Sequence, residues 1–253
     1  MGSGRAGEMK AILTYHSIDG SGSVISIDRM TFRRQMEWLS GSGMAVVGLD
    51  RVLQWDSGTD VVAITFDDAF SSFVSEAWPV LRDLGLAVTV FVPTDHVGDT
   101  NAWENPARTG IPRLPLLDWN AIGRLVASGV DVGSHTRTHA DLRKVPLERV
   151  ADEVVESADR IAAETGRRPS AFSYPYGSLN EDVRDLVAGR YRVAVTTELR
   201  PVGPDEDPHR LPRLDSYYFR RPGRMERLGT TAMKRYLTIR RGLRAARSLV
   251  MRG

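Results

Sequence analysis

Short apolar runs rich in β-branched residues alternate along the chain with segments of helical period. Apolar runs of this length, bounded by turn residues, are typical of buried strands. The strands expected on this pattern are Ala11–Tyr15, Met44–Gly48, Val61–Phe66, Ala87–Val92, Val130–Gly133, Ala171–Tyr174, Tyr191–Thr196 and Leu211–Leu214. The helices expected between them are Arg29–Ser40, Val74–Leu84, Trp119–Ser128, Leu147–Glu164 and Glu181–Ala188. Strands that alternate with helices indicate βα units around a parallel sheet.

The number and spacing of these elements predict an α/β fold with one domain, a distorted or incomplete (β/α) barrel of parallel strands at residues 11–218. Residues 1–10 are expected to form a flexible N-terminus, and residues 219–253 a basic helical tail. Between Asp99 and Leu117 the chain is rich in Pro and Asn and has no period, which predicts a long irregular loop. Loops of this length in a compact domain are often functional.

The amino-acid composition narrows the possible chemistry. Hydrophobic residues make up 42% and charged residues 26% of the 253 residues, as in ordinary globular proteins. The absence of cysteine excludes disulfides and thiolate chemistry, so any metal must be bound by His, Asp or Glu. The first apolar segment, Ala11–Leu13, is too short for a signal-peptide core, and no run approaches the roughly 20 apolar residues of a membrane span. We therefore expect a cytoplasmic protein.

The C-terminal segment carries most of the positive charge. From Arg220 to Gly253, ten Arg and one Lys stand against one acid, Glu226, a net charge of +10 in a chain whose total is +2. Such a segment can contact an anionic membrane face, at the periphery of the inner membrane, or form a solvated helix. The apolar residues within Tyr236–Arg252 could contact lipid or pack against the barrel. No nucleic-acid recognition module is evident, so no nucleic-acid partner is expected.

Polar residues follow several expected strands at the point where each strand ends. These residues are His16, the pair Asp67 and Asp68, His135 and Tyr176. In parallel α/β folds the active site forms at the carboxyl ends of the strands. Several strands that deliver Asp and His to one edge therefore predict a metal hydrolase.

Asp67, Asp68, His135 and His139 suggest a metal site with a base beside it. Adjacent carboxylates repel each other, and the pair is best explained if one binds a cation and the other accepts a proton, although a solvated turn would also hold two Asp. Two His four residues apart would lie on one face of a helical turn and bind one ion, although surface helices also produce this spacing by chance. Two His and one carboxylate leave coordination positions open, as in catalytic sites.

Pro175-Tyr176-Gly177 follows another expected strand and predicts a sharp turn. Such a turn can aim backbone N–H groups into a cleft, where they would stabilise an oxyanion. The alternative is an ordinary turn beside buried aromatic residues.

Together these segments resemble, in order and spacing, the three motifs of the polysaccharide deacetylase family, also called the chitooligosaccharide deacetylase homology domain or carbohydrate esterase family four. Thr65-Phe66-Asp67-Asp68 is similar to its T-F-D-D-G motif and His135-Thr136-Arg137-Thr138-His139 to its H-S/T-x-x-H motif. Tyr174-Pro175-Tyr176-Gly177 is similar to the end of its R-x-P-Y-G motif. The resemblance runs from about Lys10 to about Tyr218.

The resemblance implies a metal-dependent hydrolase that removes N-acetyl groups from a glycan, glycolipid or oligosaccharide. Asp68, His135 and His139 would bind the metal, which we expect to be zinc, with cobalt, nickel and manganese as alternatives. Asp67 would be the general base that takes a proton from the attacking water, and the backbone N–H of Tyr176 would help to form the oxyanion hole. An amidohydrolase acting on a small non-sugar amide and a catalytically silent carbohydrate-binding homologue remain alternatives.

Two positions depart from the family pattern. Ala69 replaces the Gly that follows the Asp pair, and Ser173 stands where many members have an Arg that orients the base. Arg213, on the last expected strand, could supply that charge.

The general acid has two candidates. The C-terminal L-x-H motif is not evident, and His209 is the only later histidine. Tyr15-His16 resembles a Y-H pair of the exopolysaccharide poly-N-acetylglucosamine deacetylases, a branch whose motifs are circularly rearranged. We therefore favour His16 over His209.

Overall fold

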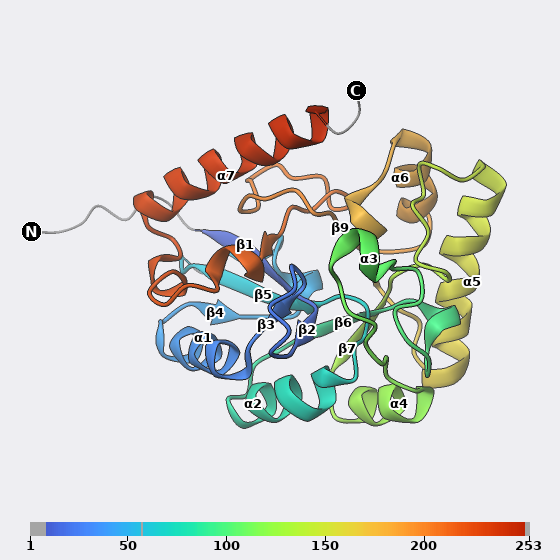
Figure 1. Cartoon of the computed structure of the whole chain (residues 1–253), viewed down its shortest axis with the longest axis horizontal. Coiled ribbons are helices and arrows are strands. Elements are labelled where there is room, and N and C mark those ends of the chain that lie inside the picture. Colours follow the sequence, from blue (N-terminus) through green and yellow to red (C-terminus); the bar gives the residue numbers. More distant parts are fainter. Residues whose placement is uncertain (1–8, 57, 251–253) are drawn as a thin grey trace, which may run out of the picture.

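The computed structural model describes residues 9–56 and 58–250, and no side chain is described at position 245 or at positions 247–250. Residues 1–8 of the expected flexible N-terminus and residues 251–253 of the expected tail lie outside the described residues. Figure 1 shows the strands at the centre of the molecule, α1, α2, α4 and α5 around them, and α7 across the top.

Within the described residues, parallel strands form an eight-stranded sheet in the order β10-β1-β5-β6-β7-β8-β9, with β4 paired to β5. The strands are β1 (Lys10–Tyr15), β4 (Ala45–Val46), β5 (Val61–Phe66), β6 (Thr89–Val92), β7 (Asp131–Ser134), β8 (Ala171–Ser173), β9 (Val193–Val195) and β10 (Leu214–Asp215). The predicted distorted (β/α) barrel of parallel strands is confirmed.

The segment around Pro212 closes the barrel where a last full strand was expected. Leu211 exchanges backbone hydrogen bonds with β9, through Ala194 and Thr196, and Leu214 pairs with β1. Proline has no backbone N–H and cannot continue a ladder. The chain therefore crosses from one sheet edge to the other within four residues, and β10 begins only at Leu214.

The helices are α1 (Arg29–Gly41), α2 (Trp78–Asp83), α3 (Pro106–Thr109), α4 (Trp119–Ala127), α5 (Leu147–Thr165), α6 (Glu181–Ala188) and α7 (Thr231–Val250). The expected helix Val74–Leu84 differs from the prediction, because it starts with a π-helical turn at Phe73–Ala77 and continues as α2. Pro79 in the first turn of α2 lacks the N–H that an α-helical ladder would need, so the two segments meet there.

Alternate residues of the strands point into the barrel. Ile12, Ala63, Phe91, Val195 and Leu211 are among the buried residues of the interior cluster. The residues between them face the surrounding helices: those of β1, β5 and β6 belong to a second, larger cluster, and Phe172 of β8 and Ala194 of β9 belong to a third. This two-sided burial explains why the strands are continuous apolar runs in the sequence.

Two segments lie over the carboxyl ends of the strands. A small parallel pair, β2 (Ser17–Ile18) and β3 (Ser26–Ile27), follows β1 and had not been predicted. The expected irregular loop Asp99–Leu117 contains only the single turn α3 as a regular element, and the isolated antiparallel bridges Thr100–Pro115 and Phe70–Leu116 hold its base.

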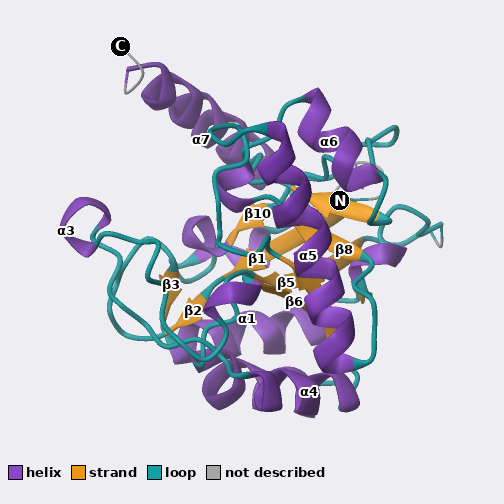
Figure 2. Cartoon of the chain, turned by 90° about the vertical axis from the view of Figure 1, so that its right-hand side faces the viewer, coloured by secondary structure: helices purple, strands orange, loops and turns teal. Residues whose placement is uncertain are grey.

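The first half of α7 packs on the barrel. Met233 and Leu237 are 3% exposed and belong to the larger cluster. Beyond Thr238 the helix leaves this core, and Figure 2 shows its C-terminal half extending past the barrel on the side of β2, β3 and α3. Among the described residues, no helix combines the length and the apolar character needed to cross a bilayer.

Candidate active site and metal centre

A cavity of about 780 Å³ opens at the carboxyl ends of the strands. Its lining includes all six residues that the sequence predicted for the site, namely His16, Asp67, Asp68, His135, His139 and Tyr176. This volume is within the range of pockets that bind small ligands. The parallel sheet thus brings together side chains that are up to 160 positions apart in the chain.

Asp67 continues the inward-facing positions of β5. Val61, Ala63 and Thr65 alternate into the barrel, and Asp67 is the next residue in this series. Its side chain is buried, with the residue only 3% exposed. A carboxylate in this position needs a partner, because an isolated buried charge is costly.

Arg213 is that partner. Its Nη1 and Nη2 donate to Oδ1 and Oδ2 of Asp67 at 2.7 and 2.6 Å, and its Nη2 also donates to Oγ of Ser173 at 3.0 Å. Arg213 is itself 2% exposed. The short Ser173 side chain leaves room for this guanidinium, so the charge absent from position 173 reaches Asp67 from the crossing segment that closes the barrel.

Arg213 also keeps Asp67 ionised. Burial alone would raise the pKa of the Asp67 carboxyl, but the charge of Arg213, with smaller effects of His135 and His16, outweighs burial and holds the pKa well below its usual range. Bidentate Arg–carboxylate pairs are among the strongest side-chain interactions and fix the carboxylate plane.

Asp68, His135 and His139 form a compact group of buried donors beside Asp67. Oδ1 of Asp68 lies 3.5 Å from Nε2 of His135 and 3.3 Å from Nε2 of His139. Two ligands at about 2.0–2.2 Å from one ion in a tetrahedral arrangement are about 3.4 Å apart. The same Oδ1 atom is buried and has no hydrogen-bond partner among the described residues. The spacing and the unpartnered oxygen both fit a bound divalent metal.

The rings of both histidines are held from behind. Nδ1 of His135 lies 2.7 Å from the carbonyl oxygen of Ser173, which can only accept, so Nδ1 carries the proton and the lone pair of Nε2 faces Asp68. Nδ1 of His139 lies 3.2 Å from the hydroxyl of Tyr176. Burial lowers the pKa of His135 to about 4, so the imidazole is neutral near pH 7. A neutral ring with a fixed tautomer is the form that binds metals.

The segment between the two histidines is not a helical turn, and that expectation was wrong. Thr136 and His139 adopt left-handed backbone conformations with φ of 66° and 58°. The irregular path, and not helical periodicity, brings the imidazoles to a centroid distance of 4.8 Å.

Backbone strain is concentrated in the three motifs. Among the described residues, those other than glycine with positive φ are Asp68, Ala69, Thr136, His139 and Tyr176. Each such residue costs about 1 kcal/mol or more, and residues of this kind persist mainly at functional sites. Ala69, where the family has Gly, adopts the left-handed conformation that Gly would favour, with φ of 53°.

Glu153 of α5 holds the loop that carries the histidines, and sequence reasoning missed it. This fully buried carboxylate accepts the backbone N–H groups of Arg137 and Thr138, both at 2.8 Å, and the hydroxyl of Thr138 at 2.7 Å. Arg149, one turn earlier, donates to it at 3.0 Å. In the sequence Glu153 reads as an ordinary polar position of an amphipathic helix.

Trp103, from the long loop, was also missed. Its ring stacks on His139 at a centroid distance of 4.4 Å and an interplanar angle of 19°. Asn101, Glu104 and Ile111 of the same loop line the cavity. In the sequence, the only indication of a role for Trp103 was that an aromatic residue occurs in a loop otherwise rich in Pro and Asn.

The two candidate acids lie in different places. His16 lines the cavity with Nε2 3.9 Å from Oδ2 of Asp67. The ring of His209 instead contacts the carbonyl oxygen of Tyr191 at 2.9 Å and lies 3.7 Å from Asp207. His209 is not among the cavity-lining residues, so the geometry favours His16.

Tyr176 lies at the cavity edge with its side chain 52% exposed and a φ of 60°. Gly177 follows with a φ of 67°, and a Cβ there would lie 2.3 Å from Oγ1 of Thr197. Only glycine fits that position. The tight turn therefore requires glycine after Tyr176, which itself lines the cavity.

Comparisons with known proteins agree with this geometry. The polysaccharide deacetylase family model matches residues 55–190. The chain is 24% identical over 203 residues to the poly-beta-1,6-N-acetyl-D-glucosamine N-deacetylase of Staphylococcus epidermidis, which covers 75% of this chain and 67% of that protein.

Two solved structures share the fold. IcaB from Ammonifex degensii superposes with a TM-score of 0.75 at 22% identity, over 90% of this chain and 98% of that one. BC0361, a polysaccharide deacetylase from Bacillus cereus, superposes with a TM-score of 0.70 at 25% identity over 83% of this chain, which spans only 65% of that longer protein. The chain belongs to the polysaccharide deacetylase family.

Proposed function

We propose that this protein is a metal-dependent N-deacetylase that hydrolyses acetamido groups of a sugar substrate. The observation that carries the proposal is the adjacency, in one cavity, of the Asp68, His135 and His139 group and the Asp67–Arg213 pair. A divalent metal bound by that group would polarise the acetyl carbonyl and lower the pKa of a water molecule toward neutrality.

The chain's own residues supply the proton transfers. Asp67, ionised and held in a fixed plane by Arg213, would accept the proton of the attacking water. His16, whose Nε2 lies 3.9 Å from Oδ2 of Asp67, would donate a proton to the leaving amine. The Tyr176 peptide N–H would stabilise the oxyanion of the tetrahedral intermediate.

Two observations argue against a catalytically silent homologue. Arg213 contacts the base in place of the missing motif Arg, and Ala69 adopts the left-handed backbone conformation that Gly would favour. Burial of a second carboxylate, Asp67, beside the metal group is energetically costly. A protein that only bound sugar would gain nothing from it.

The test is acetate release from a panel of N-acetylated oligosaccharides and small non-sugar amides. We expect activity on the sugars that disappears after chelation, returns with divalent metal, and is lowered at least about 100-fold in Asp67→Asn. Activity on the amides alone would show that the substrate is a small non-sugar amide and not an N-acetylated sugar. No hydrolysis by a metal-loaded protein would contradict it.

A further inference from the structure

The rim of the cavity combines positive charge with exposed aliphatic side chains. Arg240, Leu243 and Arg244, all from the C-terminal half of α7, line the cavity together with Val24 of the β2–β3 loop. Ile239, one turn before Leu243, lies beside them on the helix. These five residues form the rim surface.

The aliphatic members of the rim surface are unusually exposed. Ile239 is 63%, Leu243 56% and Val24 54% exposed, which places them among the most exposed large hydrophobic residues of the described chain. Ile239 and Leu243 are four residues apart, so they share one face of α7. Neither contributes to the core clusters that hold Met233 and Leu237.

The arginines of the rim surface have no acidic partner among the described residues. Within the described residues, no carboxylate lies within ion-pair distance of Arg240 or Arg244, whereas Arg213 is paired with Asp67 of the same cavity. The Arg240 guanidinium lies 5.2 Å from the ring of Tyr218, and its Nε is buried without a hydrogen-bond acceptor.

The two halves of the rim surface are joined to each other. Arg220, at the start of the basic segment, donates to the carbonyl oxygens of Gly22 and Ser23, next to Val24. Its guanidinium also lies 4.7 Å from the ring of Tyr217, which lines the cavity. The β2–β3 loop and the C-terminal segment therefore form one continuous surface around the opening.

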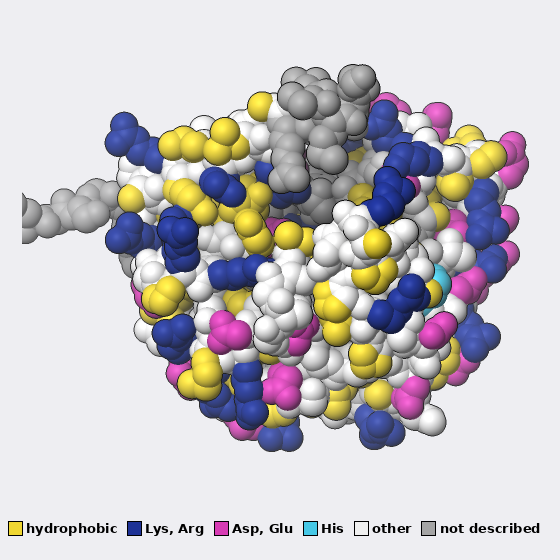
Figure 3. Space-filling view, viewed as in Figure 1, with side chains coloured by type: hydrophobic (Ala, Val, Ile, Leu, Met, Phe, Trp, Pro, Cys, Tyr) yellow, Lys and Arg dark blue, Asp and Glu magenta, His cyan; other side chains and the backbone are white. Residues whose placement is uncertain are grey.

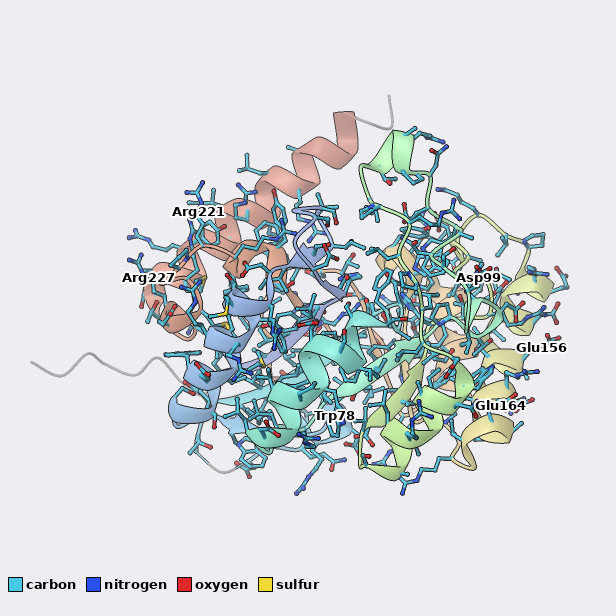
Figure 4. The ribbon with its side chains drawn as sticks, turned by 60° about the horizontal axis from the view of Figure 1, so that its bottom comes forward. Trp78, Asp99, Glu156, Glu164, Arg221 and Arg227 are labelled. Carbon is cyan, nitrogen blue, oxygen red and sulfur yellow. The ribbon has the colours of Figure 1, made fainter. Side chains whose placement is uncertain are left out.

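Charge is distributed unevenly over the whole molecule. Figure 3 shows Lys and Arg interspersed with hydrophobic side chains over α7 and the segment before it. Figure 4 shows Arg221 and Arg227 pointing outward on that side, with Glu156 and Glu164 of α5 on the opposite side. The segment from Arg220 to Gly253 carries a net charge of +10.

We propose that the rim surface docks on an anionic lipid surface, so that the cavity faces an N-acetylated sugar carried by a lipid. A basic helix with exposed Ile and Leu on one face is the type that lies in the membrane interface, with its aliphatic side chains among the acyl chains and its arginines at the head groups. The sugar part of this statement rests on the deacetylase function proposed above.

Other occupants fit the rim surface less well. A nucleic acid would satisfy the arginines but leave Ile239 and Leu243 against phosphates and water. A second copy of the chain would bring two segments of net charge +10 together. An anionic bilayer accommodates the charged and the aliphatic side chains at once.

The test is flotation of the full chain with vesicles of phosphatidylcholine alone or with added phosphatidylglycerol, at low and high salt. We expect binding only to the anionic vesicles and release by salt. Each cationic side chain near such a surface adds about fivefold to partitioning. Arg240→Gln/Arg244→Gln should therefore bind about 20- to 30-fold more weakly, and Ile239→Ser/Leu243→Ser should also lose binding.

A matched control is available at the other end of the barrel. Arg190 and Arg192 are exposed near the amino end of β9, far from the cavity, and Arg190→Gln/Arg192→Gln removes the same charge. This control and the inactive Asp67→Asn should float like the wild type. An equal loss in the control, a failure of the wild type to float, or a dimer that the rim variants dissociate would overturn the docking proposal. Acetate release without flotation would refute docking alone, and flotation without acetate release would refute the proposed function alone.

Discussion

The Asp67–Arg213 contact shows how one residue pair compensates for a change in a motif. The sequence has Ser where the family has Arg, yet the base is held by a guanidinium that reaches it from a position 40 residues later. Sequence inspection named Arg213 as a candidate because of its place on the last expected strand. It could not predict the bidentate geometry, which depends on where Pro212 turns the chain across the barrel.

Removal of Arg213 should leave a buried carboxylate without its partner. We expect Arg213→Gln to lower the free energy of unfolding by about 3–5 kcal/mol and to raise the pKa of Asp67. Chemical denaturation measures the first effect. The double variant Asp67→Asn/Arg213→Gln has no unpaired charge and should recover part of the loss. If it is no more stable than Arg213→Gln, the loss comes from packing and not from the unpaired charge.

Ala69 provides a test of the strained conformation. Because its φ is 53°, Ala69→Gly relieves strain while it loses one buried methyl group, and the two effects nearly cancel. We expect stability within about 1 kcal/mol of the wild type, whereas Ala69→Val should lose at least about 2 kcal/mol. Thermal unfolding compares the two. Equal effects of Gly and Val would show that the backbone here is not strained.

At the scale of elements, regular structure was predictable and irregular structure was not. Strands such as β5 are continuous apolar runs, and α5 carries a clear helical period, so burial alone determines them. The path between His135 and His139 has no such pattern. It depends on hydrogen bonds to Glu153, a residue whose burial only the packing of α5 against β7 reveals.

Glu153 should act as a positioning residue for the metal ligands. Glu153→Gln replaces one acceptor oxygen with an amide N–H₂, which cannot accept from the backbone N–H groups of Arg137 and Thr138. Because this loop carries the histidines, we expect about 10- to 100-fold weaker metal binding in a protein that still folds. Titration with zinc measures the affinity. Glu164→Gln, on the exposed side of the same helix and paired only with Arg160 among the described residues, is the matched control and should bind like the wild type. Unchanged zinc affinity in Glu153→Gln would show that Glu153 does not position the metal ligands.

At the scale of the whole molecule, the sequence predicted the barrel and the meeting of the motifs at one end, because parallel strands leave few other arrangements. It did not predict that α7 would divide into a packed half and a half at the cavity rim. Leu237 and Leu243 look equivalent in the sequence, and only their distance from the core separates them.

The stability of the metal-free protein should depend on pH through His135. Its pKa is about 4 in the folded protein and about 6.5 when unfolded, so between these values the unfolded chain binds a proton that the folded chain does not. Stability should therefore be greatest above about pH 6.5 and fall by about 3 kcal/mol as the pH decreases to 4. His135→Asn should flatten this part of the profile. A wild-type profile that is already flat would contradict the assignment.

We propose that Asp68, His135 and His139 bind the metal and that Asp67 does not. The most direct measurement is the metal content per chain, with acetate release in parallel, for the wild type, His139→Ala, Asp68→Ala and Asp67→Asn. We expect one metal per chain in the wild type and in Asp67→Asn, much less in the other two variants, and acetate release by the wild type only. Full metal content in His139→Ala and Asp68→Ala, or loss of the metal in Asp67→Asn, would contradict it.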